Sequence, residues 1–462
     1  MEKFQVGIIG GGPGGYVAAI RAAQMGAKVA LIERDEVGGT CLLRGCIPTK
    51  AFLATADFLA KIRESERFGI EVGQPTLNYA KTLERKNAIV QKLIKGVHSL
   101  LKAHKIEYVQ GEGKLLGDGR IGVTLAQGQA KGECEKIIVA TGSTELKPEM
   151  FKVDGINVIT SREALDLKEI PESVLIIGGG YIGCEFASMF NDFGSQVTVV
   201  EMLPQLVATE EKEVSQTLKS QFKKRGITVM TNTKLVNLDV SDGKVTASLD
   251  SGETVTAEKA LVAVGRKPVT EGIGLEQLGV ELSENGGIKV NEKLETGATN
   301  VYAIGDVLGT VMLAHVASTQ AKTAVANALG GTETFSYNAI PNCIFTRPEI
   351  ASVGMKEGQA SEAGYDVATA KFQFSALGKA MIIEETTGFV KVVADRKSDK
   401  VLGVSMIGPG VTDIIHEMVL AIHAGLSVEQ VAKMIHAHPT LPESIHEAVE
   451  GIHKQAIHMI SR

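Results

Sequence analysis

Two copies of one glycine-rich pattern constrain the fold of this chain more than any other feature. Residues 6–33 read VGIIGGGPGGYVAAIRAAQMGAKVALIE, and residues 174–201 read VLIIGGGYIGCEFASMFNDFGSQVTVVE. Each copy has an apolar run, the pattern G-x-G-x-x-G, an amphipathic stretch, a further glycine and a second apolar run that ends in Glu. This order is typical of a βαβ unit that binds a dinucleotide, so the chain is predicted to contain two such units.

Each residue type in the pattern has a physical task. The first glycine makes a tight turn, the second lets the backbone approach a pyrophosphate, and the third lets the helix pack closely on the strand. The N-terminus of the helix then offers unpaired N–H groups to the phosphates, and the final glutamate accepts hydrogen bonds from ribose hydroxyls. The candidate residues are Gly10, Gly12, Gly15 and Glu33 in the first copy, and Gly178, Gly180, Gly183 and Glu201 in the second.

The residues after the second copy indicate which nicotinamide cofactor it binds. Glu201 is followed by Met202, Leu203 and Pro204. A 2′-phosphate would be repelled by the carboxylate and would find no neighbouring Arg to receive it. The sequence therefore favours NAD(H) over NADP(H) at this unit, whereas the pattern alone does not identify the cofactor of the first unit.

A pair of cysteines follows the first unit in the segment GGTCLLRGCIPTK at residues 38–50. Cys41 and Cys46 could be structural thiols, half of a zinc site or a redox pair. Zinc requires four ligands, and no His or further Cys lies close in the sequence. The position beside a dinucleotide unit favours a redox pair, in which one thiolate attacks a disulfide and the other passes electrons to a flavin.

Lys50 stands four residues after Cys46. If this stretch is helical, the two side chains share a face, and the ammonium would lower the pKa of a nearby thiol. The alternative is a solvated surface lysine.

Composition and charge exclude several other classes of protein. The net charge is −6 with acids and bases interspersed, which is unlike a nucleic-acid-binding surface. No uninterrupted apolar stretch is long enough to span a membrane, and we see no secretory leader. Five Cys in 462 residues are too few for a disulfide scaffold, so a cytoplasmic protein is expected. Cys134, Cys184 and Cys343 belong to no motif and are interpreted as small core residues.

With these motifs in place, the chain resembles the pyridine-nucleotide disulfide oxidoreductase family. The resemblance starts from G-G-T-C-x4-C-x-P-x-K after an N-terminal fingerprint and covers essentially the whole chain. It includes A-T-G-S at Ala140–Ser143, A-V-G-R at Ala263–Arg266, A-I-G-D at Ala303–Asp306, P-E-I-A-S-V-G at Pro348–Gly354 and H-A-H-P-T-L-P-E at His436–Glu443.

The resemblance implies a role for each matching residue. Cys46 would be the thiol next to the flavin, Cys41 the thiol that meets the substrate, and Lys50 would pair with Glu185 beside the flavin. The FAD site would comprise Gly10, Gly12, Gly15, Glu33, Gly39, Thr40, Lys50, Gly113, Thr141, Gly142, Asp306 and Ala314, and the NAD site Gly178, Gly180, Gly183, Glu185, Glu201 and Gly265.

The same resemblance makes His438 an acid/base that acts in the active site of the partner subunit of a homodimer. Glu443 would orient it, and the His438–Pro439 bond would be cis. Because seven of the ten His lie after residue 415, a metal-binding tail is an alternative. Those His are scattered through segments patterned as helices, such as Asp413–Ala424 and Glu443–Met459, so we expect no metal site.

We expect an α/β protein with two Rossmann-like dinucleotide-binding domains followed by an α+β dimerisation domain. The predicted boundaries are 1–147 for the FAD domain, 148–265 for the NAD domain, 266–338 for a segment that completes the FAD domain, and 339–462 for the interface domain. A helical stretch from Thr49 to Leu101 is expected inside the first domain. In the interface domain, FVKVVAD and VLGVSMIG are predicted to be adjacent strands.

Within the family, the sequence favours the branch that oxidises protein-bound dihydrolipoamide. Glutathione reductases use NADPH, which Glu201 disfavours, and mercuric reductases carry a C-terminal Cys pair, whereas no Cys follows Cys343. The lipoyl carrier would be a separate chain, and the alternative is an NADH-dependent reductase of another disulfide. Leu43 and Arg44 stand where the family usually has Asn-Val, so Arg44 either lies beside the disulfide or points to solvent.

Overall fold

The first glycine-rich copy forms the centre of a seven-stranded sheet in the computed structural model, which describes residues 2–117, 119–125 and 128–460. Its strands, in spatial order, are β3 (Glu107–Gln110), β2 (Val29–Glu33), β1 (Glu2–Ile9), β6 (Gly128–Val139), β5 (Arg120–Leu125) and β4 (Glu112–Gly117), with β17 (Val301–Ala303) pairing on β6. β1, β2, β3, β6 and β17 pair in parallel, while β4, β5 and β6 are antiparallel. Val6 and Ile8 are fully buried because helices cover this sheet.

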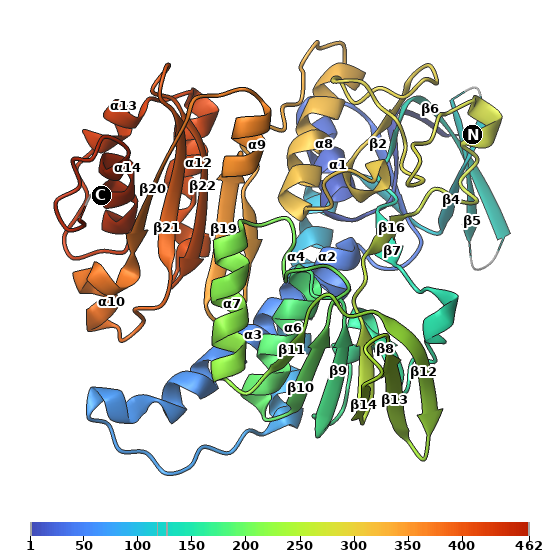
Figure 1. Cartoon of the computed structure of the whole chain (residues 1–462). Coiled ribbons are helices and arrows are strands. Elements are labelled where there is room, and N and C mark those ends of the chain that lie inside the picture. The colour runs from blue at the N-terminus through green and yellow to red at the C-terminus, as the bar shows by residue number, and fades with distance from the viewer. Residues whose placement is uncertain (1, 118, 126–127, 461–462) are drawn as a thin grey trace.

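The helices of this unit come from distant parts of the chain. They are α1 (Pro13–Gln24), α4 (Tyr79–Ala103) and α8 (Ala314–Ala328), and all three contribute to one apolar core. α1 and α8 pack directly on one another, as Figure 1 shows.

The second copy forms a five-stranded parallel sheet in the lower right of Figure 1. The order is β11 (Thr228–Met230), β10 (Gln196–Val200), β9 (Ser173–Ile177), β15 (Lys259–Val262) and β8 (Val158–Thr160). α5 (Ser161–Ala164), α6 (Tyr181–Phe193) and α7 (Lys212–Lys224) accompany it, and β12 (Leu235–Ser241), β13 (Lys244–Leu249) and β14 (Thr254–Ala257) form a separate antiparallel sheet.

Glycine is required at the first and third positions of both patterns. Gly10 and Gly178 have φ values of +106° and +110°, which disfavour a side chain. A Cβ on Gly15 would lie 1.7 Å from the Gly10 oxygen, and one on Gly183 would lie 2.0 Å from the Gly178 oxygen. The close approach of each helix to its strand therefore depends on these glycines.

The stretch expected to be helical from Thr49 to Leu101 is interrupted. α2 (Gly39–Arg44) and α3 (Cys46–Arg63) precede a short 3₁₀ turn, η1 (Ser65–Phe68), and α4 begins only at Tyr79. Gly69 ends the turn with a φ of +71°, and the Asn78 side chain caps α4 by accepting the Lys81 N–H at 3.1 Å. Residues 69–78 therefore form a connecting segment outside any helix.

The interface domain contains a five-stranded antiparallel sheet, on the left of Figure 1. Its order is β18 (Asn342–Ile344), β19 (Glu349–Gly354), β22 (Val401–Gly408), β21 (Phe389–Asp395) and β20 (Val367–Gln373), which confirms the predicted pairing of FVKVVAD with VLGVSMIG. Its helices are α9 (Glu357–Glu362), α10 (Gly378–Ile382), α11 (Val411–Ile414), α12 (His416–Ala424), α13 (Val428–Ala432) and α14 (Glu443–Ile452).

Two helix predictions in this domain were too long. The stretch Asp413–Ala424 is divided between α11 and α12, and α14 ends at Ile452 instead of Met459. Gly451 lies in the last turn of α14, and Lys454 has a left-handed φ of +60°, which stops the helix.

The remaining elements connect these units. β7 (Ser143–Glu145) and β16 (Arg266–Pro268) form a two-stranded antiparallel sheet, and the 3₁₀ turns are η2 (Glu149–Phe151), η3 (Glu276–Leu278), η4 (Gly305–Leu308) and η5 (Phe374–Ala376). The fold class is confirmed. The domain boundaries stay predictions, and their outer limits, residues 1 and 462, lie outside the described residues.

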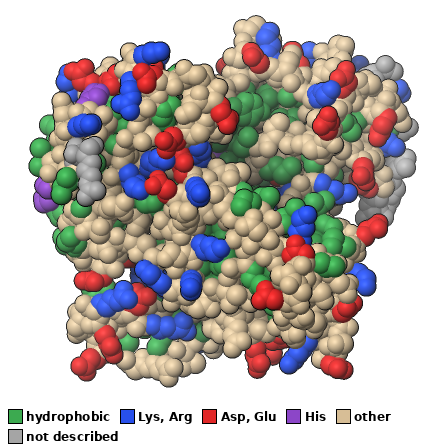
Figure 2. All heavy atoms as spheres, in the orientation of Figure 1, with side chains coloured by type: hydrophobic (Ala, Val, Ile, Leu, Met, Phe, Trp, Pro, Cys, Tyr) green, Lys and Arg blue, Asp and Glu red, His purple; other side chains and the backbone are tan. Residues whose placement is uncertain are grey.

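On the face drawn in Figure 2, side chains of Lys and Arg are intermingled with those of Asp and Glu. In the part of the chain that the structure describes, no helix is both long enough and apolar enough to cross a membrane.

Candidate active site

A cavity of about 1630 Å³ lies where the units meet. Its walls include residues from the first glycine-rich turn, the Cys segment, the start of α6 and the loop around β18. The following predicted FAD residues line it: Gly10, Gly12, Glu33, Gly39, Thr40, Lys50, Gly113, Thr141, Gly142, Asp306 and Ala314. Gly15 does not line the cavity because it packs beneath the turn, against the Gly10 oxygen.

Cys41 and Cys46 both line this cavity as free, half-buried thiols. Cys41 lies in α2, and Cys46 is the first residue of α3, so the break at Gly45 brings the two sulfurs within hydrogen-bond contact. This hydrogen bond lowers the pKa of Cys46 and raises the pKa of Cys41, while burial opposes ionisation of both. Cys46 therefore ionises first.

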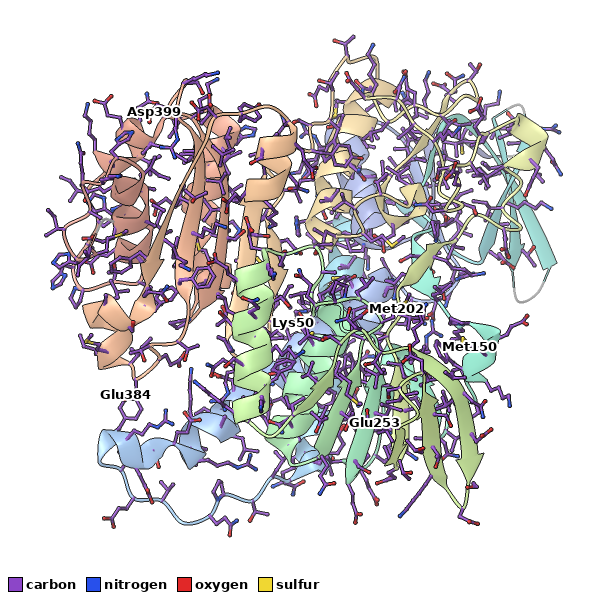
Figure 3. All side chains as sticks on the ribbon, viewed as in Figure 1. Lys50, Met150, Met202, Glu253, Glu384 and Asp399 are labelled. Carbon is purple, nitrogen blue, oxygen red and sulfur yellow. The ribbon has the colours of Figure 1, made fainter. Side chains whose placement is uncertain are left out.

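Lys50 lies on α3 one turn after Cys46 and forms an ion pair with Glu185 of α6. The Lys50 Nζ lies 2.8 Å from Oε1 and 2.7 Å from Oε2 of Glu185, whose side chain is only 4% exposed. The ammonium lowers the pKa of Cys46 and the carboxylate raises it. Lys50, labelled in Figure 3, lines the cavity and is paired with a buried carboxylate, so it is not the solvated surface lysine considered as the alternative.

Three of the motifs that carry the family resemblance meet at the cavity wall, through Ser143, Arg266 and Asp306. Arg266 Nε donates to Ser143 Oγ at 2.8 Å, and Ser143 Oγ donates to Asp306 Oδ2 at 2.5 Å. Burial raises the pKa of Asp306, and Ser143 and Arg266 offset this only in part. Sequence reasoning missed Ser143 and Arg266 as site residues, although both close motifs that carry the family resemblance.

Arg44 lines the cavity and is paired with Asp35. Its side chain is 20% exposed, so the guanidinium is held at the cavity wall instead of pointing into solvent. Cys343 also lines the cavity and is only half-buried, unlike the buried Cys134 and Cys184. Cys343 packs against the apolar core of the interface domain, so it lies at the edge of that core and also faces the cavity.

The glutamate that ends each glycine-rich copy holds its own turn together. Glu33 accepts the N–H groups of Gly11 at 2.6 Å and Asp35 at 2.8 Å. Glu201 does the same for Gly179 at 2.5 Å and Leu203 at 2.6 Å. Of the predicted NAD residues, Glu185 lines the cavity, whereas Gly178, Gly180, Gly183, Glu201 and Gly265 lie outside its described lining.

His438 and Glu443 form a pair outside the described lining of the cavity that holds the thiols. The His438 Nδ1 lies 2.7 Å from Glu443 Oε1, and Glu443 Oε2 accepts the Thr440 N–H at 2.7 Å. Burial opposes ionisation of Glu443, but the bonds from Thr440 and His438 outweigh it and hold its pKa below the usual range. The His438 side chain is 78% exposed, and its bond to Pro439 is cis, as expected.

The lining of the cavity suits a dinucleotide. A Cβ on Gly12 would meet only the Gly39 Cα, at 3.8 Å, so the backbone at this turn faces open space. Gly12 also precedes α1 at its N-terminus, where unpaired N–H groups favour phosphate. The carboxylates of Asp306 and Glu33 lie at the cavity wall, and carboxylates accept hydrogen bonds from hydroxyl groups such as those of a ribitol or ribose. The residues present therefore fit FAD.

Similarity to known proteins shows which family the chain belongs to. Residues 4–321 match the model of the pyridine nucleotide-disulphide oxidoreductase family, and residues 340–449 match the dimerisation domain of the same family. The chain belongs to this family, whose members use FAD and NAD.

Several curated relatives of the chain are named dihydrolipoyl dehydrogenase. The Bacillus subtilis protein is 44% identical, with 99% of both chains covered, and the Thermus scotoductus protein is 40% identical, with 100% of both covered. Among solved structures, LpdA from Mycobacterium tuberculosis matches with a TM-score of 0.91 at 27% identity, covering 97% of this chain and 99% of that one. The flavoprotein disulfide reductase RclA from Escherichia coli matches with a TM-score of 0.88 at 28% identity, covering 97% and 99%.

Proposed function

We propose that this protein oxidises protein-bound dihydrolipoamide to lipoamide and reduces NAD+ to NADH. One observation carries the proposal: Cys41 and Cys46 lie in contact on the wall of a cavity that suits FAD, beside the Lys50–Glu185 ion pair. The full-length similarity to dihydrolipoyl dehydrogenases supports dihydrolipoamide as the substrate.

The chemistry at sulfur follows from the order in which the thiols ionise. In the oxidised protein the two cysteines form a disulfide, and a substrate thiol loses its proton to His438. The resulting thiolate attacks Cys41, a mixed disulfide forms, and Cys46 leaves as the thiolate. The second substrate thiol then attacks the mixed disulfide, which releases lipoamide and leaves Cys41 protonated. When bound, FAD would carry the electron pair of the Cys41–Cys46 dithiol to NAD+ while the disulfide between the two cysteines re-forms. Of the two protons held by His438 and Cys41, one ends in NADH and the other in solvent.

The residues of the chain divide into two binding sites in this proposal. Asp306, Glu33 and the turn at Gly10–Gly12 hold FAD, with Gly15, Gly39, Thr40, Gly113, Thr141, Gly142 and Ala314 around it. NAD+ binds at the turn formed by Gly178, Gly180 and Gly183, with Glu201 at the ribose and Gly265 and Glu185 nearby.

We infer that the enzyme is a homodimer that shares its active sites between subunits. The exposed, oriented His438 lies outside the described lining of the cavity in its own chain, which is expected if it serves the partner's thiols. The partner in the reaction is a separate lipoyl-carrying protein. A cytoplasmic location remains a prediction from the sequence, which has only five Cys.

The experiment is a steady-state assay of NADH formation from dihydrolipoamide and NAD+ by the purified holoenzyme. We expect turnover with this pair, little with NADP+, and loss of turnover in a Cys46→Ser variant. Reduction of glutathione disulfide by NADH in place of dihydrolipoamide oxidation would keep the class and contradict the substrate.

A further inference from the structure

Residues 345–347, between β18 and β19, contact one face of α6. The Phe345 N–H donates to Glu185 Oε1 at 3.0 Å, and the Arg347 N–H donates to Ser188 Oγ at 3.2 Å. The Arg347 guanidinium also pairs with Asp192, at 3.6 Å. Glu185, Ser188 and Asp192 are spaced three and four residues apart, so they share one face of the helix. The interface-domain loop 345–347 therefore follows α6 from Glu185 to Asp192.

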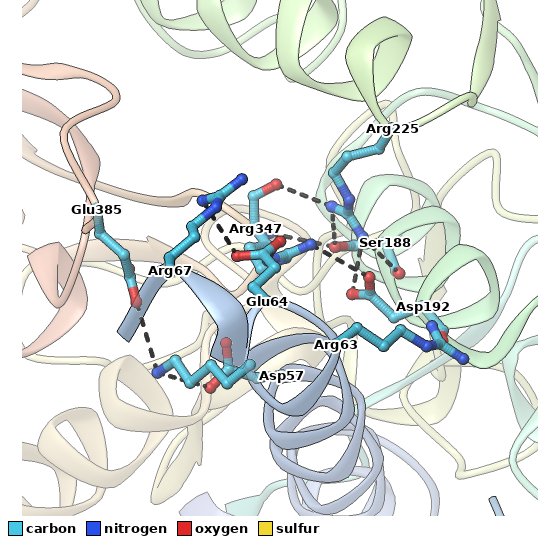
Figure 4. A network of polar contacts seen from close by, with 10 residues as sticks. Asp57, Arg63, Glu64, Arg67, Ser188, Asp192, Arg225, Arg347 and Glu385 are labelled. Carbon is cyan, nitrogen blue, oxygen red and sulfur yellow. Dashed lines mark hydrogen bonds and ion pairs between the residues drawn. The ribbon is translucent and has the colours of Figure 1, made fainter. Parts of the chain in front are cut away.

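A polar network holds Arg347, which forms the outer end of this loop, the end away from the thiols (Figure 4). Arg225 donates to the Arg347 carbonyl oxygen at 2.9 Å and pairs with Asp192 at 2.7 Å. Glu64 pairs with the Arg347 guanidinium at 3.0 Å. The side chains of Arg225 and Asp192 are 13% and 8% exposed, so their ion pair is shielded from water, whereas those of Glu64 and Arg347 are 35% and 31% exposed. The network sets the position of the loop along α6 and hence the position of Phe345.

Phe345, which forms the inner end of the loop, contacts the Lys50–Glu185 ion pair. The Lys50 Nζ lies 4.6 Å from the centroid of the Phe345 ring, within the range of a cation–π contact. Both carboxylate oxygens of Glu185 and the ring of Phe345 thus contact the Lys50 ammonium. The N–H of Phe345 in turn donates a hydrogen bond to Glu185. Phe345 also lines the cavity, together with Lys50 and Cys46.

We propose that Phe345 is a positioning residue for the Lys50–Glu185 ion pair, its N–H fixing the carboxylate and its ring fixing the ammonium beside Cys46. The inference rests on the proposed function and assigns the interface domain a part in the redox chemistry. The charged or titratable side chains that act on Cys46 include Cys41, Lys50 and Glu185, of which Lys50 lowers its pKa and Glu185 raises it. Tyr181, at the start of α6, also interacts with Cys46. The ionisation of Cys46 therefore depends on where the ammonium is held.

The test compares Phe345→Leu with Phe345→Tyr, because both keep the N–H but only Tyr keeps the aromatic face. The FAD-loaded enzymes are reduced by dithionite, and the long-wavelength absorbance of the Cys46 thiolate beside the flavin is titrated with pH. We expect the Leu variant to bind the Cys46 proton roughly threefold more tightly or more, and the Tyr variant to match the wild type.

A second variant, Arg347→Met, leaves Phe345 in place and releases the outer end of the loop. It should shift the same titration in the same direction as Phe345→Leu. An unchanged titration in Phe345→Leu would overturn the proposal whatever Arg347→Met does, as would a Tyr variant that shifts as far as Leu. FAD content and the unfolding midpoint of each sample show whether a variant is folded. Because dithionite replaces the substrate, failure of dihydrolipoamide turnover would count only against the proposed function.

Discussion

Cys46 has a thiol whose ionisation is governed by three neighbouring side chains. The hydrogen bond from Cys41 and the charge of Lys50 lower its pKa, whereas burial and Glu185 raise it. A thiol with a lowered pKa is ionised over a wider pH range. Because Lys50 lowers the pKa of Cys46, the Cys46 thiolate of the reduced enzyme persists to lower pH than it would without Lys50.

Replacing the Lys50 ammonium with an uncharged group should narrow the pH range over which Cys46 is a thiolate. In Lys50→Met the pKa of Cys46 should rise, because a group that favours the thiolate has been removed while burial remains. The measurement is the pH titration of the long-wavelength absorbance in the reduced enzyme, whose midpoint should move upward. Lys61→Met is the matched control, since Lys61 lies on the same helix and is half exposed. An unchanged midpoint in Lys50→Met would contradict this account of Cys46.

The Glu443 carboxylate is expected to matter only in the half-reaction with the dithiol. Glu443→Gln removes the negative charge that orients His438 and should slow dihydrolipoamide oxidation by roughly 10²-fold or more. Reduction of ferricyanide by NADH, which does not require the base, should continue at the wild-type rate. Glu429→Gln, in an exposed pair with Lys433, is the control. Equal loss of both activities would instead indicate structural damage.

The contacts of individual site residues could be predicted from the sequence to different extents. The contact between Lys50 and Glu185 was predicted, but only through the family resemblance, because 135 residues separate the two side chains. The direction of the Arg44 side chain was left open and its partner Asp35 was not predicted, since nothing local shows which way a side chain on a short helix points. Ser143 and Arg266 were seen as motif ends without a role, because their bond forms only once β7 and β16 pair.

At the scale of elements, the βαβ turn depends on the third glycine of its pattern. In Gly15→Ala the new Cβ would lie 1.7 Å from the Gly10 oxygen, so the turn must open. We expect a loss of bound FAD and a destabilisation of roughly 2–3 kcal/mol or more. Denaturant unfolding and FAD absorbance measure the two effects.

The matched control for this substitution is Gly96→Ala. Gly96 lies inside α4, where a Cβ would meet no atom within 4 Å. This variant should keep its FAD and gain roughly 0.5–1 kcal/mol of stability. If Gly15→Ala behaved like Gly96→Ala, the close packing of α1 on its strand would not be needed for the cofactor site.

Elements were predictable where their signal is local. The two apolar runs around each glycine-rich turn predicted parallel strands, because such strands are buried on both faces. The gap between α3 and α4 was missed although its signal is local, because Gly69, Gly73 and Pro75 lie within seven residues and together disfavour a continuous helix. The pairing of β21 with β22 was predicted from neighbouring apolar runs and is confirmed.

At the scale of the whole molecule, the cavity is assembled from segments far apart in the sequence. Its lining runs from Ile9 to His416 and combines both dinucleotide-binding units with the interface domain. Periodicity and composition predict the separate units but do not say how they meet. Only the order of motifs shared with a known family predicted that the thiols, Asp306 and Glu185 would share one site.

Sharing of the active site between subunits can be tested by mixing two inactive variants. His438→Ala homodimers lack the base, and Cys46→Ser homodimers lack the redox pair, so each should be inactive with dihydrolipoamide. Heterodimers formed by co-expression contain one site with both groups and should recover activity. If the mixture remained inactive although heterodimers were isolated, His438 would act within its own chain.

The most direct test of the central claim is an anaerobic half-reaction. The oxidised holoenzyme is mixed with dihydrolipoamide, its visible spectrum is recorded, and NAD+ is then added. We predict a long-wavelength band from the Cys46 thiolate beside the flavin, which disappears as NADH forms. A spectrum unchanged by dihydrolipoamide, in an enzyme that NADH reduces and another disulfide reoxidises, would contradict the claim.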